Sequence, residues 1–206
     1  MHSACDNQGP GKQPGPVTDL SGHIMNRSEL LTALKHHQPT SIQEGRHLAS
    51  VIEFVTQHEH CCSRHLAIGH ITASSWIIDQ AGRHALLTHH RKLGRWLQLG
   101  GHVEDDSDIL TAALREACEE SGLATLHAVD DRIFDVDVHP IPARRDEPAH
   151  LHYDLRFLLQ ADRGAELTIS DESHDLRWFS IDELRALPDD ESIKRMVDKM
   201  QLRLGS

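Results

Sequence analysis

Residues 101–123 read Gly-His-Val-Glu-Asp-Asp-Ser-Asp-Ile-Leu-Thr-Ala-Ala-Leu-Arg-Glu-Ala-Cys-Glu-Glu-Ser-Gly-Leu and carry more information about the fold than any other part of the chain. Seven side chains between Glu104 and Glu120 are carboxylates. Gly122 suits the left-handed residue that ends a helix. Acidic or hydroxyl side chains favour a helix start, and the candidates for the cap are Asp105, Asp106 and Ser107. The stretch therefore predicts a helix of about four turns.

The two sides of this helix differ in chemistry. At about 100° per residue, one face is apolar and should pack on a core, with Leu110, Ala113, Leu114 and Ala117. Glu116, Glu119 and Glu120 fall within about one quadrant beside that face. Carboxylates at this spacing repel each other by a few tenths of a kcal/mol per pair, and the C-terminal end of the helix dipole opposes them as well. We therefore expect a compensating positive charge.

Two sources of positive charge fit this helix. Arg115 can neutralise one carboxylate, and a hard divalent cation, Mg²⁺ or Mn²⁺, prefers oxygen ligands and can compensate the others. The alternative is a solvated acidic face, which is the usual meaning of a run of Glu. The preceding residues favour the cation, because a short apolar strand at residues 96–99 runs through Gly100-Gly101 into the helix. Glycine lets a backbone approach a ligand closely, so Gly101 is a further candidate metal ligand.

The spacing of these residues resembles the signature of the Nudix hydrolases. That signature has a Gly, five residues, a Glu, seven residues, and then Arg-Glu-apolar-any-Glu-Glu-any-Gly-apolar. The positions in register are Gly101, Arg115, Glu116, Glu119, Glu120, Gly122 and Leu123. Ser107 stands where the signature has its first Glu, which is usually a supporting residue. A spaced pattern of this length is a strong signal.

The resemblance implies a divalent-metal-dependent hydrolase in which water attacks phosphorus in the diphosphate linkage of a nucleoside diphosphate derivative. A nucleotide sugar, a dinucleotide and a nucleoside triphosphate all fit. Glu116, Glu119 and Glu120 would be the metal ligands, and Arg115 would orient them through a salt bridge. Glu116 and Glu119 therefore also belong to the expected catalytic residues. Glu172 lies where many members supply another acidic group that can accept a proton from water, although a turn or cap is the alternative.

Two other functions stay open at this point. The first is a ligand-sensing Nudix domain that binds a nucleotide sugar without cleaving it, although such domains usually lose the metal-ligand carboxylates. The second is an enzyme similar to isopentenyl diphosphate isomerase, because Cys61-Cys62-Ser63 resembles its catalytic cysteine run. The position of that run, ahead of the first core strand, argues against the isomerase.

Apolar patterning predicts an α/β (α+β) fold with a mixed sheet sandwiched between helices. The resemblance implies the same Nudix-type sheet. The expected strands are residues 68–78, 85–88, 96–99, 133–138, 151–159 and 176–179, and a final helix is expected at 191–202. We expect the chain to divide into three segments: a disordered leader at 1–24, an N-terminal helical extension at 25–60 and the Nudix domain at 61–206. The leader is rich in Gly and Pro, which is typical of disorder, and Met25 after it is a plausible native start.

The helical extension should contain two helices. Ser28 suits the cap of a short first helix, and Ser41 with Glu44 suits a capping box at the start of the second. We expect these helices to pack on the Nudix core, whereas binding a second copy and partly covering the site are the alternatives.

Several polar side chains outside the helix are candidate substrate ligands. The strands at 133–138 and 151–159 alternate, so if they pair their polar sides form one wall. Solvent exposure is the alternative for this wall, and ordinary surface charge is the alternative for each cation. The substrate-binding candidates are Lys92, His150, His152 and Arg156.

Composition narrows the class of protein further. The chain has 206 residues with 38% apolar content, enough for one sizeable core, and its net charge of −11 argues against a long nucleic acid as partner. Four cysteines show neither zinc spacing nor a disulfide framework. We expect a cytoplasmic protein that does not insert into a membrane and that acts on a small molecule. The resemblance also makes a homodimer compatible with the chain.

Overall fold

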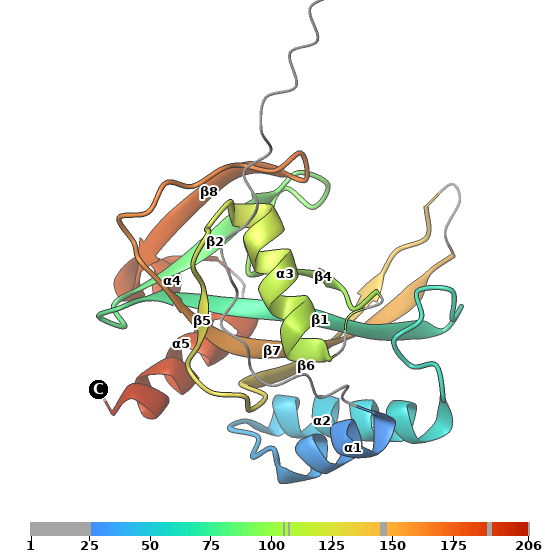
Figure 1. Cartoon of the computed structure of the whole chain (residues 1–206). Coiled ribbons are helices and arrows are strands. Elements are labelled where there is room, and N and C mark those ends of the chain that lie inside the picture. Colours follow the sequence, from blue (N-terminus) through green and yellow to red (C-terminus); the bar gives the residue numbers. More distant parts are fainter. Residues whose placement is uncertain (1–25, 105, 107, 145–147, 189–190, 206) are drawn as a thin grey trace, which may run out of the picture.

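The computed structural model describes residues 26–104, 106, 108–144, 148–188 and 191–205, so the expected leader and Met25 lie outside the described residues. An eight-stranded sheet lies between helices, as the sequence predicts (Figure 1). The helices are α1 (Arg27–His36), α2 (Ile42–Gln57), α3 (Ile109–Ser121), α4 (Ile181–Ala186) and α5 (Glu191–Leu204). The strands are β1 (Gly69–Asp79), β2 (His84–His90), β3 (Arg95–Leu97), β4 (Leu99–His102), β5 (His127–Ala128), β6 (Asp135–Ile141), β7 (His150–Ala161) and β8 (Ser173–Ser180).

The sheet is mixed because its central pair is parallel. β1 and β7 run in parallel from the pair Gly69–Leu151 to the pair Asp79–Ala161, and the other pairings are antiparallel. β4 pairs with β1, β8 with β2, and β6 with β7. The expected pairing of the two late strands is therefore confirmed, with Asp135 opposite Arg156. The short elements β5 and α4 were not predicted from the sequence.

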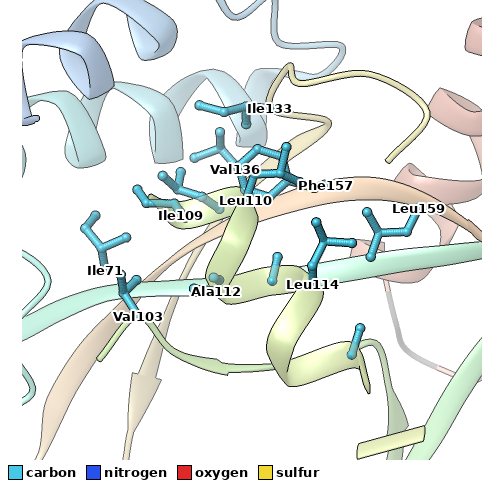
Figure 2. Close-up of a cluster of buried hydrophobic side chains, with 14 of the residues drawn as sticks. Ile71, Val103, Ile109, Leu110, Ala112, Leu114, Ile133, Val136, Phe157 and Leu159 are labelled. Carbon is cyan, nitrogen blue, oxygen red and sulfur yellow. The ribbon is translucent and has the colours of Figure 1, made fainter. Parts of the chain in front are cut away.

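A separate hydrophobic core lies on each face of the sheet. Figure 2 shows the first core, where Leu110 and Leu114 of α3 meet Val136, Phe157 and Leu159 of the sheet. Helices α1 and α2 contribute to this same core. The second core lies on the other face and joins the sheet to α4 and α5, with Trp76, Ile78, Phe134, Leu158, Met196 and Met200 among its members. The apolar face expected for α3 is confirmed, since its four residues are all buried.

The ends of α3 explain how the acidic helix starts and stops. Its N-cap is Asp108, whose side chain accepts from the Thr111 backbone N–H at 2.9 Å. The three expected cap residues were therefore wrong: Asp106 makes a different contact, and Asp105 and Ser107 lie outside the described residues. Gly122 ends the helix with φ of 70°, the left-handed conformation that its sequence position predicts.

Helices α1 and α2 pack on the sheet side that carries α3. Asn26, not Ser28, caps α1, and its capping box is completed by Glu29. Ser41 caps α2 as expected, but the expected box is only half formed, because the Glu44 carboxylate turns away to Thr40, His37 and Lys199. Glu44 is fully buried, which ties the extension to the rest of the fold.

The polar wall of β6 and β7 is a buried ion network and not a solvated surface. Arg156 is 2% exposed and donates to Asp135 at 3.0 Å, Asp137 at 2.9 Å and Asp154 at 2.8 Å. From α5, Arg195 and Lys199 also reach Asp135, and Lys199 contacts Glu44 of α2. We call this group the buried ion network, and its members are Glu44, Asp135, Asp137, Asp154, Arg156, Arg195 and Lys199.

The burial of this ion network changes the expected role of Arg156. Burial alone would raise the pKa of the Asp154 carboxyl, but the charges of Arg156 and His139 and the hydrogen bonds from Arg156 and Ser74 together lower it. Three aspartates beneath α5 neutralise the charge of Arg156, so we do not retain it as a substrate ligand.

Among the residues that the structure describes, none of the helices could span a membrane.

Candidate active site

Arg115 organises the acidic side of α3. Its guanidinium donates to Glu116 at 2.9 Å, to Glu119 at 3.1 Å and to the His102 carbonyl of β4 at 2.9 Å. Two further hydrogen bonds reach one oxygen of Asp106, at 3.0 and 2.9 Å. Burial lowers the pKa of Arg115, but the carboxylates of Asp106 and Glu116 outweigh it and raise this pKa. A fixed cation thus joins the β4–α3 loop to the carboxylates of the helix.

Asp106 takes the supporting position that the signature assigns to a Glu one residue later. The sequence has Ser107 there, so which residue orients Arg115 could not be read from the signature. The structure supplies the carboxylate from Asp106, which is still close enough to accept two N–H bonds from one guanidinium. An arginine held by a carboxylate is restricted in geometry as well as neutralised.

We expect Asp106→Asn to lower kcat/KM by about tenfold, because a neutral amide weakens a charge-assisted contact by roughly 1 to 2 kcal/mol. Steady-state kinetics would measure the loss, with Asp131→Asn, an exposed aspartate, as the matched control. Adding Ser107→Glu to Asp106→Asn, which restores the signature, should recover most of the activity. Unchanged kinetics in Asp106→Asn would contradict this role of Asp106.

Two glycines bring β4 against the helix. A Cβ on Gly101 would lie 2.5 to 2.6 Å from the Glu116 carboxylate, and a Cβ on Gly100 would lie 2.5 Å from the backbone of Ala73 and Ser74. Glycine is required at position 100, where a Cβ would meet backbone atoms, whereas a Cβ at position 101 would displace the Glu116 carboxylate. The Gly100 N–H also donates to Glu120 at 3.1 Å. The backbone of Gly101 therefore lies beside the carboxylates, as the sequence suggests.

The three glutamates have different environments. The Glu119 side chain is 60% exposed, whereas Glu120 is 7% exposed as a residue. Burial raises the pKa of Glu120 to about 8, against the Gly100 N–H and with help from the charges of Glu116, Glu172 and Glu119. Burial also raises the pKa of Glu116, although Arg115 opposes it. The cluster therefore holds more negative charge than Arg115 compensates.

A hard divalent cation fits this excess of negative charge. The donors are carboxylate oxygens, which Mg²⁺ and Mn²⁺ prefer, and beside burial the charges of the neighbouring glutamates help to raise the pKa of Glu120. Arg115 binds Glu116 and Glu119 through single oxygens, Oε1 and Oε2. The residues that could hold the cation are therefore those expected from the sequence: Glu116, Glu119, Glu120 and the Gly101 backbone.

Glu172 lies close enough to the carboxylates of α3 to interact with them electrostatically. It is exposed just before β8, and its charge raises the pKa of both Glu116 and Glu120. Its carbonyl accepts from the Arg91 N–H at 2.8 Å, which places the turn between β2 and β3 against this segment. Lys92, the next residue in that turn, is exposed. Glu172 and Lys92 thus belong to neighbouring segments.

His150 and His152 have other histidines as neighbours. The His70 ring centroid lies 5.2 Å from that of His150 and 4.8 Å from that of His152. His102 also adjoins His70, at 5.0 Å between ring centroids. The sequence analysis missed His70, because a single His in an apolar strand gives no signal until the parallel register places it beside His152.

A pocket of about 430 Å³ adjoins the site on the side of the N-terminal helices. Its lining includes Asp106 and His102 next to Arg115, and Cys61, Cys62 and Arg64 from the loop after α2. The three glutamates of α3 are not among its lining residues. The pocket therefore borders the residues that support the carboxylates and not the carboxylates themselves.

Comparisons with known proteins agree with this geometry. The sequence profile of the NUDIX domain matches residues 69–200. Among solved structures, a C. elegans Ap4A hydrolase in a binary complex has a TM-score of 0.53 at 19% identity, over 66% of this chain and 97% of that one. A NUDIX-family hydrolase from Clostridium perfringens has a TM-score of 0.46 at 24% identity, over 65% and 97%. A search of curated proteins found no match.

The structural likeness concerns the fold, whereas the profile covers most of the chain and includes all the residues that form the acidic cluster of α3. The family expected from the signature is confirmed. The chain belongs to the Nudix family of pyrophosphohydrolases.

Proposed function

We propose that this Nudix pyrophosphohydrolase uses Mg²⁺ or Mn²⁺ to cleave the diphosphate linkage of a nucleoside diphosphate joined to another group. The main supporting observation is that Arg115 holds Glu116 and Glu119 while the neighbouring Glu120 is buried with its pKa raised to about 8. Nucleotide sugars, dinucleotides and nucleoside triphosphates all contain the linkage. A small molecule is also the partner that suits a chain of net charge −11.

Each residue of the site has a separate task in this proposal. Glu116, Glu119, Glu120 and the Gly101 backbone hold the cation, which neutralises diphosphate oxygens and lowers the pKa of a water molecule. Arg115 fixes the orientation of Glu116 and Glu119. Glu172 accepts the proton of the attacking water, because an exposed carboxylate near the cluster has solvent to pass the proton on.

A substrate contact is proposed for one exposed cation. Lys92 lies in the turn next to the Glu172 segment, where an ammonium group suits phosphate oxygens. The sequence also suggests His150 and His152, but His150 is 8% exposed and is surrounded by other imidazoles, so the proposed contact is that of Lys92. Lys92→Ala should therefore raise the KM for substrate more than it lowers kcat.

The raised pKa of Glu120 predicts that metal affinity depends on pH. Below about pH 8 this carboxyl holds a proton in the metal-free protein, and a cation has to displace it. The affinity for Mg²⁺ should therefore rise by about tenfold per pH unit toward pH 8 and then level off. Calorimetry in two buffers with different protonation enthalpies would measure the proton released on binding.

The raised pKa of Glu120 also makes the stability of the folded chain depend on pH. Because the folded pKa lies above the ordinary value of 4.5, the contribution of Glu120 to stability is fully present below pH 4.5 and is lost as pH rises through about 8. Bound Mg²⁺ should oppose this loss. Glu120→Gln should remove the pH dependence of both affinity and stability, and metal affinity that stays constant from about pH 6 to pH 9 would contradict the assignment.

A panel of substrates tests the proposed function. The full chain is incubated with Mg²⁺ or Mn²⁺ and with nucleoside triphosphates, nucleotide sugars, dinucleotides and dinucleoside polyphosphates, and the products are separated and identified. Cleavage of one class at the diphosphate would support the hydrolase. Tight binding without cleavage would favour a nucleotide-sugar sensor, and isomerised isopentenyl diphosphate would favour the isomerase.

A further inference from the structure

A second group of potential metal ligands lies on the sheet face opposite α3. His70 of β1 stands beside His152 of β7 in the parallel register, and His150 lies two residues earlier on the same side of β7. Each of the three offers a ring nitrogen, and these nitrogens all lie within 4.8 Å of one another. Although 82 residues separate Thr72 of β1 from Asp154 of β7, the same pairing brings these two side chains into contact. The geometry of the sheet thus assembles the imidazoles.

His70 has an unusual environment for a polar side chain. It is 1% exposed, and within the described ranges both of its ring nitrogens are buried without a hydrogen-bond partner. Most buried polar atoms in proteins have such a partner, and exceptions mark water, an ion or a functional role. A bound metal ion would use one of these nitrogens directly.

His150 is oriented as a metal ligand is commonly oriented. Its Nδ1 lies 2.9 Å from the Pro148 carbonyl oxygen, which can only accept, so Nδ1 carries the proton. Nε2 is then the nitrogen with the lone pair, and this atom is buried. A backbone carbonyl that fixes the tautomer in this way is a regular companion of metal-ligating histidines.

We propose that His70, His150 and His152 form a binding site for a transition-metal ion of the Zn²⁺ type, separate from the carboxylate site of α3. Imidazole nitrogens suit such ions, whereas Mg²⁺ prefers oxygen. Tetrahedral Zn²⁺ with bonds of about 2.0 to 2.1 Å needs ligand nitrogens about 3.4 Å apart, so modest rotations of the imidazoles complete the site. His102 is a neighbouring imidazole that could take the fourth position.

The position of this site gives it a structural consequence for β4. His102 lies opposite Thr72 on the histidine side, whereas the preceding Gly101 faces Glu116. An ion held by β1 and β7 would therefore adjoin β4 at His102, the residue next to Gly101. We expect it to hold the central parallel pair β1 and β7 together.

Zinc binding by the full-length, tag-free protein tests the proposal. ZnCl₂ is titrated in competition with a chromophoric chelator, CoCl₂ is followed by its visible absorption, and a large excess of MgCl₂ is present. We expect one Zn²⁺ per chain and a thermal midpoint that rises with Zn²⁺. His70→Gln with His152→Gln should weaken binding by at least about 100-fold, whereas His127→Gln, an exposed histidine on β5, should not change it.

Two further measurements separate this site from others. Glu119→Gln should leave Zn²⁺ binding unchanged, and loss of binding in that variant would instead assign the ion to the carboxylates. Nitrogen-15 spectra of the histidine rings in the natural sequence should show three imidazoles shifted by Zn²⁺, a readout that does not depend on a variant folding. No stoichiometric binding, or shifts confined to other histidines, would overturn the proposal.

Discussion

Glu119→Gln is expected to lower kcat/KM by roughly three orders of magnitude, which corresponds to about 4 kcal/mol of transition-state stabilisation. The side chain keeps its volume and loses the charge with which it would hold a cation. Because Glu119 is 60% exposed, the substitution should leave the thermal midpoint close to that of the natural sequence. Initial rates on the substrate identified in the panel, measured over a range of Mg²⁺ concentrations, would give the effect on both kcat and metal dependence.

The matched control for this variant is Glu166→Gln, because Glu166 is an exposed glutamate in the segment after β7 and outside the carboxylate cluster of α3. It should keep full activity. If Glu119→Gln turned over substrate at the natural rate, the carboxylate cluster of α3 would not be the catalytic site. If high Mg²⁺ restored the rate, the loss would be one of metal affinity alone, and the role of Glu119 as ligand would stand.

Asp135→Asn is expected to destabilise the folded chain by about 3 to 5 kcal/mol, because it leaves three buried cations short of one negative charge. Asp135 is fully buried and accepts from Arg156, Arg195 and Lys199. Denaturant unfolding would measure the free energy, and the thermal midpoint should fall by roughly 10 °C. Asp162→Asn, at an exposed position, is the control.

A double-mutant cycle can then show how far the buried ion network acts as one unit. Lys199 contacts both Asp135 of β6 and Glu44 of α2, so Glu44→Gln and Asp135→Asn should not be additive. Additive losses would show that α2 is held independently of α5. A loss below about 1 kcal/mol in Asp135→Asn would contradict the expected cost of an uncompensated buried charge.

The amino-acid sequence predicted most of the sheet and the acidic helix, because alternation and helical spacing are local properties. The expected strand at 151–159 and the observed β7 (His150–Ala161) differ by only one or two residues at each end. The predicted start of α3 was wrong. Asp106 and Asp108 are equally good caps in sequence, and only the position of Arg115 assigns Asp106 to another partner.

The polar side of β7 shows where local patterns stop being informative. Alternation correctly placed Asp154 and Arg156 on one side of the strand, but alternation does not say what covers that side. Helix α5 covers it with Arg195 and Lys199, two cations that in sequence resemble the solvated face of an amphipathic helix. Pairing between segments far apart in sequence determines burial here, and the same applies to His70 beside His152.

The contact between Glu44 and Lys199 has a consequence for synthesis of the chain on the ribosome. These residues are 155 positions apart, so at about 5 to 20 residues per second Glu44 is synthesised roughly 8 to 30 s before Lys199. During that interval the carboxylate has no ammonium group to match it, and burying it alone would be costly. Helix α2 therefore completes its docking only after α5, which carries Lys199, has been synthesised and has left the ribosome.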